Sequence, residues 1–176
     1  MEATTAERLA GMAAAGDEQA FGALVRASSR TLYAAARAIL KSDQDAQDCV
    51  QEAVLLAWRK LPTLRDRACF TTWITRITIN AAINMTRRRK PSAPLRADLP
   101  ARGERSDERL DIRRAIESLD EKTRLCAVLY YFEDMPIEQI AQAVHARPGT
   151  VKSRLFRARE KLRSVLEGYG HGQKID

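Results

Sequence analysis

The sequence has few of the residues that mark disulfide-linked, metal-binding or membrane-spanning proteins. Its 176 residues include three cysteines and two histidines, too scattered to predict a disulfide framework or a zinc site. No apolar stretch approaches the length of a membrane span, and the start of the chain lacks the segments of a signal peptide. We expect no metal, no cofactor and no membrane insertion, a cytoplasmic location, and cysteines that are buried as small apolar residues rather than redox-active.

Glycine, proline and aromatic residues are also scarce, with 8 glycines, 6 prolines and 6% aromatics. No segment alternates as a strand would, whereas apolar residues recur at helical spacing almost continuously to about residue 89. The composition then becomes rich in proline and poor in apolar anchors. We therefore predict an all-α protein of two small helical domains, residues 1–89 and 110–167, joined by an extended linker at 90–109 and followed by a flexible tail at 168–176.

The net charge of +7 and the pI near 9.7 make a polyanionic partner plausible. The strongest pattern is at Ile137–Arg159, where two short helices around a tight turn predict a helix-turn-helix. Apolar side chains at helical spacing predict which side of the second helix packs inward: Val151, Leu155, Ala158 and Leu162. The other side carries basic, hydroxyl and aromatic groups, which suits a helix that enters the major groove.

The segment Asp45–Leu61 predicts an amphipathic helix whose apolar stripe follows the i, i+3, i+4 rule closely. Its opposite side is acidic and polar, with Asp48, Gln51 and Glu52 around the large apolar Leu55. Two interpretations stay open at this point, because single exposed leucines are normal. The side is either an ordinary solvated helix face or a docking surface for another protein.

A second helix is predicted at Phe70–Met85, capped by Thr71 or Thr72. Its inward stripe consists of Phe70, Ile74, Ile77, Ala81 and Met85. The outward side carries Thr72, Arg76 and Asn80, with Trp73 at the edge. Cations, amides and planar groups together suit unpaired nucleotides. The alternative is that Trp73 belongs to the core and the arginines face solvent.

Three segments in this order resemble a known family. Asp45–Leu61, with the Asp-Cys-Val-Gln-Glu motif, is similar to region 2.2 of bacterial RNA polymerase sigma factors. Phe70–Asn84, with Phe-Thr-Thr-Trp, resembles regions 2.3 and 2.4, and Leu119–Leu162, with the motif that begins at Gly149, resembles region 4. The order and the two-domain layout resemble the extracytoplasmic-function class over about residues 15–166.

The resemblance implies a dissociable sigma subunit, not an enzyme and without a small-molecule substrate, that directs promoter-specific initiation. The implied partners are core RNA polymerase, through the β′ clamp coiled coil and the β flap, promoter DNA, and an anti-sigma factor. The implied contacts with the clamp are Asp48, Gln51, Glu52 and Leu55. Those with the single-stranded −10 element are Arg65, Asp66, Arg67, Cys69, Thr72, Trp73, Arg76 and Asn80.

The implied contacts with the duplex −35 element are Lys152, Ser153, Arg154, Phe156, Arg157 and Arg159. Lys152 and Arg157 are suited to guanine acceptors and Phe156 to a thymine methyl group, while Arg154 and Arg159 flank this face and suit phosphates. A polymerase-independent helix-turn-helix regulator is the alternative, but it leaves the acidic face at Asp48–Glu52 without a use.

The sequence departs from the family at three places. His145 stands where the turn usually has glycine, and because histidine tolerates positive φ better than most side chains we expect a strained but intact turn. Pro148 follows Arg147 at the end of the turn, and proline is acceptable in a first helical turn. The run 87–90 is strongly basic, which argues against a linker that mimics RNA and favours contact with upstream DNA.

Overall fold

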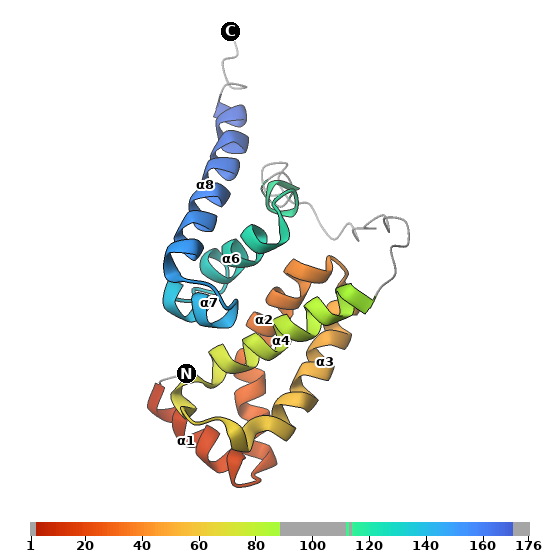
Figure 1. The fold of residues 1–176 in the computed structure, drawn as a ribbon, viewed down its shortest axis with the longest axis vertical. Helices are drawn as coiled ribbons and strands as arrows, with labels where there is room; N and C mark the ends of the chain where they lie inside the picture. The colour runs from red at the N-terminus through yellow and green to blue at the C-terminus, as the bar shows by residue number, and fades with distance from the viewer. Residues whose placement is uncertain (1–2, 89–111, 113, 171–176) are drawn as a thin grey trace.

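The structure of the protein is a computed structural model that describes residues 3–88, 112 and 114–170, and every regular element in these ranges is a helix (Figure 1). The predicted all-α fold is confirmed. The linker predicted at 90–109 lies outside the described residues. So does most of the predicted tail, although the last helix continues past residue 167 to Gly170.

The first helical unit contains four α-helices and two short 3-10 turns, in the order α1 (Ala3–Ala14), α2 (Glu18–Leu40), α3 (Asp43–Lys60), η1 (Leu61–Thr63), η2 (Arg67–Cys69) and α4 (Phe70–Arg88). Helices α2, α3 and α4 pack against one another, and α1 lies against α2 and η2. The inward stripe predicted for α4 is confirmed at Phe70, Ile74, Ile77 and Ala81, which are buried. Phe70 contacts the rings of Phe21 and Trp73.

Small side chains let α3 approach its neighbours closely. Ala46, Cys49, Ala53 and Ala57 all lie on its inner side and have no exposed surface. The thiol of Cys49 donates a hydrogen bond of 3.6 Å to the main-chain oxygen of Thr78 in α4. Since a larger side chain at any of these four positions would push α3 away from the core, packing here depends on residue size as well as apolarity.

Caps fix where these helices begin. The carboxylate of Asp17 accepts from Ala20 N at the start of α2, and Ser42 Oγ accepts from Asp45 N at the start of α3. Each such cap stabilises its helix by about 1 kcal/mol. Lys41, with φ of 58°, ends α2 in the left-handed conformation, so the chain reverses within two residues.

The second unit contains α6 (Glu121–Tyr131), α7 (Ile137–Ala143) and α8 (Pro148–Gly170), preceded by helical residues 114–117. Asp120 caps α6 by accepting from Thr123 N at 3.0 Å. The predicted helix-turn-helix is confirmed as α7 and α8, which pack together and against α6. Val151, Leu155 and Ala158 are buried as predicted.

The turn between α7 and α8 is intact despite its histidine. His145 has φ of 50°, the left-handed conformation that glycine usually supplies. The next residue closes the turn, because Ala146 N donates to Ala141 O at 2.9 Å. Pro148 is the first residue of α8, where its missing N–H has no intrahelical partner to lose. Both expectations from the sequence are confirmed.

One prediction for α4 is wrong. Neither Thr71 nor Thr72 caps it, because η2 runs directly into α4 and the cap lies earlier, at Asp66, whose carboxylate accepts from Ala68 N. The hydroxyls of the α4 threonines are used elsewhere; Thr75, for example, donates to Thr71 O within the helix.

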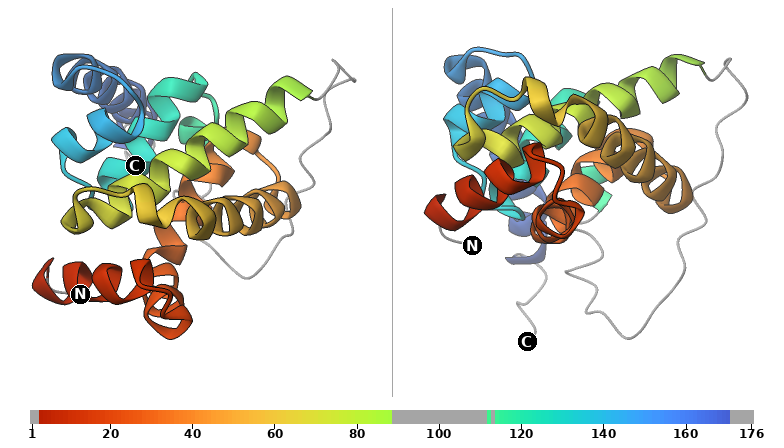
Figure 2. Two further views of the ribbon diagram at one scale, coloured as in Figure 1. Left: turned by 60° about the horizontal axis from the view of Figure 1, so that its bottom comes forward. Right: turned by 90° about the horizontal axis from the view of Figure 1, so that it is seen from below.

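The two units lie side by side, with α6 against α2 and α7 against α4 (Figure 2). Their buried apolar residues form one continuous cluster that extends from Ala10 in α1 to Leu155 in α8. No helix in the described ranges is long and apolar enough to cross a membrane.

Candidate nucleic-acid and protein interfaces

The outer side of α8 presents the residues predicted for duplex DNA. Lys152, Ser153, Phe156 and Arg157 are all exposed, Phe156 by 58% of its surface. Their side is opposite the one that Val151 and Leu155 bury, because side chains three and four residues apart share a face. Phe156 takes no part in the core of this unit and lies exposed between two cations.

The flanking arginines differ from one another. Arg159 is exposed, whereas Arg154 is half-buried and its guanidinium lies 3.9 Å from the sulfur of Cys126 in α6. Burial raises the pKa of the Cys126 thiol, while the hydrogen bond and charge of Arg154 act in the opposite direction. Arg154 therefore lies between the exposed side of α8 and the core, a position suited to a phosphate at the edge of a groove if that side binds duplex DNA.

The side of α3 that faces away from the core carries the predicted protein-docking residues. Asp48, Gln51 and Glu52 are exposed, and Leu55 between them exposes 62% of its surface. Gln44 donates a hydrogen bond of 3.3 Å to Asp48. Glu52 contributes to raising the pKa of Cys49 to about 11, although burial of the thiol is the larger cause. The sequence placed these four residues correctly on one side.

The loop before α4 brings together several of the residues predicted for unpaired DNA. Asp66 accepts from Ala68 N through one carboxylate oxygen and from the Cys69 thiol, at 3.1 Å, through the other. This hydrogen bond raises the pKa of Cys69, and burial and the charge of Asp66 add to the effect. Arg65 is exposed. A cavity of about 130 Å³ opens between this loop and α4; its lining is Leu64, Asp66, Cys69, Thr72, Trp73, Arg76 and Gln142.

Arg67 does not face this cavity. Its guanidinium donates two hydrogen bonds to main-chain oxygens at the end of α1, to Ala10 at 2.9 Å and to Gly11 at 3.2 Å. Cations are favoured near a helix C-terminus, where the helix dipole is negative. In this structure Arg67 attaches the loop to α1, which differs from the DNA contact that the family resemblance implied.

Along α4 the predicted residues are exposed to different extents. Asn80 is exposed, Trp73 and Arg76 are half-buried, and Thr72 is buried. The expectation that Thr72 lies on an open face is wrong for this arrangement, because α7 covers it and its hydroxyl donates to Gln139 Oε1 at 3.2 Å. Trp73 packs on Phe70, as expected of a core residue. It also lines the cavity, where its ring is open to a ligand.

The residues that sequence reasoning missed here belong to α7. Gln139 contacts Thr72, which precedes it by 67 residues in the chain, and Gln142 closes one side of the small cavity. Their only signal in the sequence is that they are polar and lie on the outer side of a short helix. The contact depends on the packing of one unit on the other.

Family models match both units: "Sigma-70 region 2" matches residues 24–91 and "Sigma-70, region 4" matches residues 109–162. Among curated proteins, the chain is similar to the "ECF RNA polymerase sigma factor SigM" of Mycobacterium tuberculosis, with 35% identity over 172 residues, which cover 96% of this chain and 87% of that protein. It is 32% identical to the "ECF RNA polymerase sigma-E factor" of Escherichia coli K12 over 171 residues, with coverage of 86% and 89%.

Among solved structures, the chain is similar to CnrH, determined in complex with the cytosolic domain of CnrY. The TM-score is 0.72 and the identity 28%, over 93% of this chain and 98% of CnrH. A likeness of this extent includes both helical units. These relatives give no support to a regulator that works without polymerase.

Proposed function

Because the chain belongs to the extracytoplasmic-function class of sigma-70 factors, and is thus a sigma subunit of RNA polymerase that directs promoter-specific transcription, we propose which of its surfaces performs each step. Residues 1–89 bind core polymerase and the −10 element, and residues 110–167 bind the −35 element. Residues 90–109 join them. The protein works in the cytoplasm, where core polymerase and promoter DNA are found.

The observation that carries this assignment is that two exposed surfaces of opposite charge lie on different units. The α3 surface, formed by Asp48, Gln51, Glu52 and Leu55, is acidic with an apolar centre. Like charges repel, so it is unsuited to DNA and suited to a protein partner with basic and apolar groups, for which we propose the β′ clamp coiled coil. The α8 surface, formed by Lys152, Ser153, Phe156 and Arg157, is basic and suited to the major groove.

For the −10 element we propose the loop and α4. Trp73 offers a ring for stacking, and Arg76 and Asn80 offer a cation and an amide for the strand. Extrusion of a base costs a few kcal/mol, so melting needs such contacts. The carboxylate of Asp66 lines the cavity and can accept a further hydrogen bond from a base, and Arg65 is exposed in the same loop. Arg67 supports binding indirectly, because it holds the loop against α1.

The proposed protein partners include the β flap, bound by the second unit, and an anti-sigma factor. The second partner is supported by CnrH, which was solved with a bound partner domain and resembles this chain over both units. A partner that contacts both units at once would block the separate engagement of the −10 and −35 elements.

Run-off transcription with purified core polymerase and a library of genomic templates tests the assignment. We expect initiation at a discrete set of promoters only when the chain is added, and weak binding of the chain alone to the same DNA. Tight duplex binding without polymerase, together with no chain-dependent initiation, would instead identify a stand-alone regulator. Lys152→Ala together with Arg157→Ala should abolish initiation at promoters that depend on the −35 element while core binding persists.

A further inference from the structure

The side chain and the main chain of Asp120 are both hydrogen-bonded at the start of α6. Its carboxylate accepts from Thr123 N at 3.0 Å, and Thr123 is 1% exposed. Its main-chain oxygen accepts from Arg124 N at 2.8 Å. Asp120 itself is exposed. A negative charge is therefore held at a defined position on the surface of the second unit.

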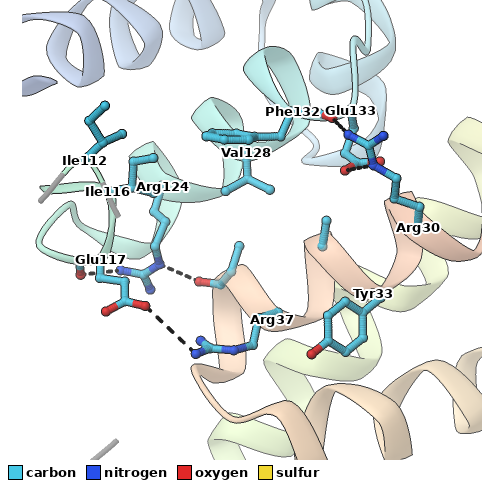
Figure 3. A pocket seen from close by; sticks show the side chains of 12 residues that line it. Arg30, Tyr33, Arg37, Ile112, Ile116, Glu117, Arg124, Val128, Phe132 and Glu133 are labelled. Carbon is cyan, nitrogen blue, oxygen red and sulfur yellow. Dashed lines mark hydrogen bonds and ion pairs between the residues drawn. The ribbon is translucent and has the colours of Figure 1, made fainter. Parts of the chain in front are cut away.

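The turn that ends at Asp120 is fixed as well, because a buried arginine binds it. Arg124 is 5% exposed and donates to Leu119 O at 2.6 Å and to Glu117 O at 3.3 Å. It also donates to Ala38 O at the end of α2, at 2.6 Å (Figure 3). A buried guanidinium is costly to leave without acceptors, so these bonds hold the turn. Asp120 is thus attached to buried residues although its side chain faces solvent.

The packing of α6 against α8 places this carboxylate near Arg157. The two helices run in opposite directions (Figure 1), and one contact between them joins Arg154 to the sulfur of Cys126 at 3.9 Å. Asp120 lies before Cys126 on α6, and Arg157 lies after Arg154 on α8, so both lie on the same side of this contact. Hydrogen bonding to Thr123 lowers the pKa of Asp120 most, and the positive charge of Arg157 lowers it further, while burial acts in the opposite direction.

A fixed carboxylate at this position has two effects on Arg157. The arginine is exposed, and its long side chain has many rotamers in the free protein. A bidentate pair with a base requires the guanidinium in one plane and one direction. A carboxylate that holds it there before binding reduces the entropy lost on binding. The same negative charge repels phosphate groups, so it disfavours contacts that carry no sequence information.

A second carboxylate, Glu160, is not equivalent to Asp120. It is exposed and follows Arg157 by three residues on α8, so the two side chains can meet on the surface of one helix. Glu160 and Arg157 therefore share the same backbone segment. Asp120 belongs to another helix and is bonded to buried residues, so it can fix the guanidinium relative to the body of the unit.

We propose that Asp120 is a positioning residue for recognition of the −35 element. Its carboxylate orients the guanidinium of Arg157 towards a base edge and repels the phosphates that would otherwise bind it. The base that Arg157 reads is then guanine, whose O6 and N7 accept a bidentate pair. This inference rests on the proposed function of Arg157, and the tests below separate the two.

The first test uses the full chain without DNA. Carboxyl NMR signals measure the titration of Asp120 in the unaltered protein and in Arg157→Ala. The pKa of Asp120 should rise in Arg157→Ala, because the variant removes a positive charge that lowers it. Arg159→Ala removes the same charge from an exposed position on the other side of α8 and should leave the titration unchanged. An unchanged titration in Arg157→Ala would overturn the proposal.

The second test measures base discrimination by holoenzyme. Asp120→Asn keeps a good helix cap but removes the charge. Discrimination between a −35 element and the same element substituted at the base that Arg157 reads should fall about threefold to tenfold, a part of the roughly 5- to 150-fold that one bidentate pair supplies. Binding to the substituted duplex should strengthen and depend more steeply on salt, because Arg157 becomes available to phosphate. Glu138→Gln removes one exposed carboxylate from α7 and should leave discrimination unchanged.

A double variant shows whether Asp120 acts through Arg157. In an Arg157→Ala background, Asp120→Asn should cause no further loss of discrimination, because the group that it positions is absent. The proposal is wrong if Asp120→Asn retains full discrimination, or if it causes the same loss without Arg157. If Arg157→Ala alone leaves discrimination unchanged, the proposed function of Arg157 is wrong and the proposal falls with it, while the titration still shows whether the two side chains interact.

Discussion

The guanidinium of Arg67 lies 2.9 Å from the main-chain oxygen of Ala10, so the loop that precedes α4 is attached to the end of α1. The same loop carries Asp66 and Cys69 beside the small cavity. The position of these two side chains therefore depends on a helix that contributes no residue to the proposed −10 surface. This relationship separates the residues proposed to contact DNA from a residue that holds their loop in place.

Arg67→Ala should destabilise the protein by about 1–3 kcal/mol, because two main-chain oxygens lose a charged donor. Urea unfolding measures the change, and Arg65→Ala, an exposed arginine in the same loop, should stay within about 0.5 kcal/mol. Strand binding by holoenzyme should weaken for Arg67→Ala as the loop loses its support. An unchanged midpoint with lost strand binding would show that Arg67 contacts DNA directly.

Glu52→Lys should weaken binding to core polymerase and leave folding and DNA recognition intact. The carboxylate is exposed on α3 beside Leu55, and reversal of a charge at a complementary interface costs affinity. We expect a reduction of about tenfold or more in the association constant, measured by fluorescence titration with core enzyme. Glu7→Lys on α1 makes the same change of charge elsewhere and should bind normally. Equal losses in both variants would point to net charge rather than to a docking surface.

Arg157→Ala should reduce recognition of the −35 element by about 1–3 kcal/mol, the usual contribution of a bidentate pair with a base. Competition between promoter variants in a holoenzyme binding assay measures it, and discrimination at one base position should be lost. Lys122→Ala removes one exposed positive charge from α6 and is the matched control. If both variants weaken binding equally for all sequences, Arg157 meets phosphate and not a base.

Asp66→Asn should make Cys69 more reactive near neutral pH. The hydrogen bond to Asp66 raises the pKa of the thiol, and the thiolate is the reactive form. Without the carboxylate, the pKa falls towards its ordinary value and more thiolate exists at a given pH. The rate of iodoacetamide reaction should rise severalfold at pH 8, and its pH profile should move to lower pH. Cys69→Ser should remove this reaction, because Cys49 and Cys126 are buried. An unchanged profile would contradict the contact.

The parts of the site that lie on one helix could be predicted from the sequence. Periodicity separated the buried Ala46, Cys49 and Ala53 from the exposed Asp48 and Glu52, because a regular helix fixes the direction of each side chain. The turn at His145 was predictable for a similar reason, since few side chains tolerate the left-handed conformation. In such segments the direction of each side chain is set by residues that are close in the sequence.

The parts that depend on contacts between helices could not be predicted. Thr72 belongs to the polar stripe of α4 by its spacing, yet α7 covers it. Arg67 donates to main-chain oxygens of α1, a contact that the sequence pattern did not indicate. Every residue has the same main-chain oxygen. The pattern of side chains in the sequence therefore cannot predict which main-chain oxygen accepts a hydrogen bond from a given arginine.

The sequence by itself determined the helices, their apolar stripes, the helix-turn-helix and the family. These are local properties, set by spacing, capping and side-chain type. Only the tertiary structure decided that the two units pack on each other, that Arg124 joins α6 to the end of α2, and that α7 covers Thr72 on α4 while Leu55 on α3 and Phe156 on α8 remain exposed. The reason is physical, because an amphipathic pattern states that a face will be buried but not which surface will bury it.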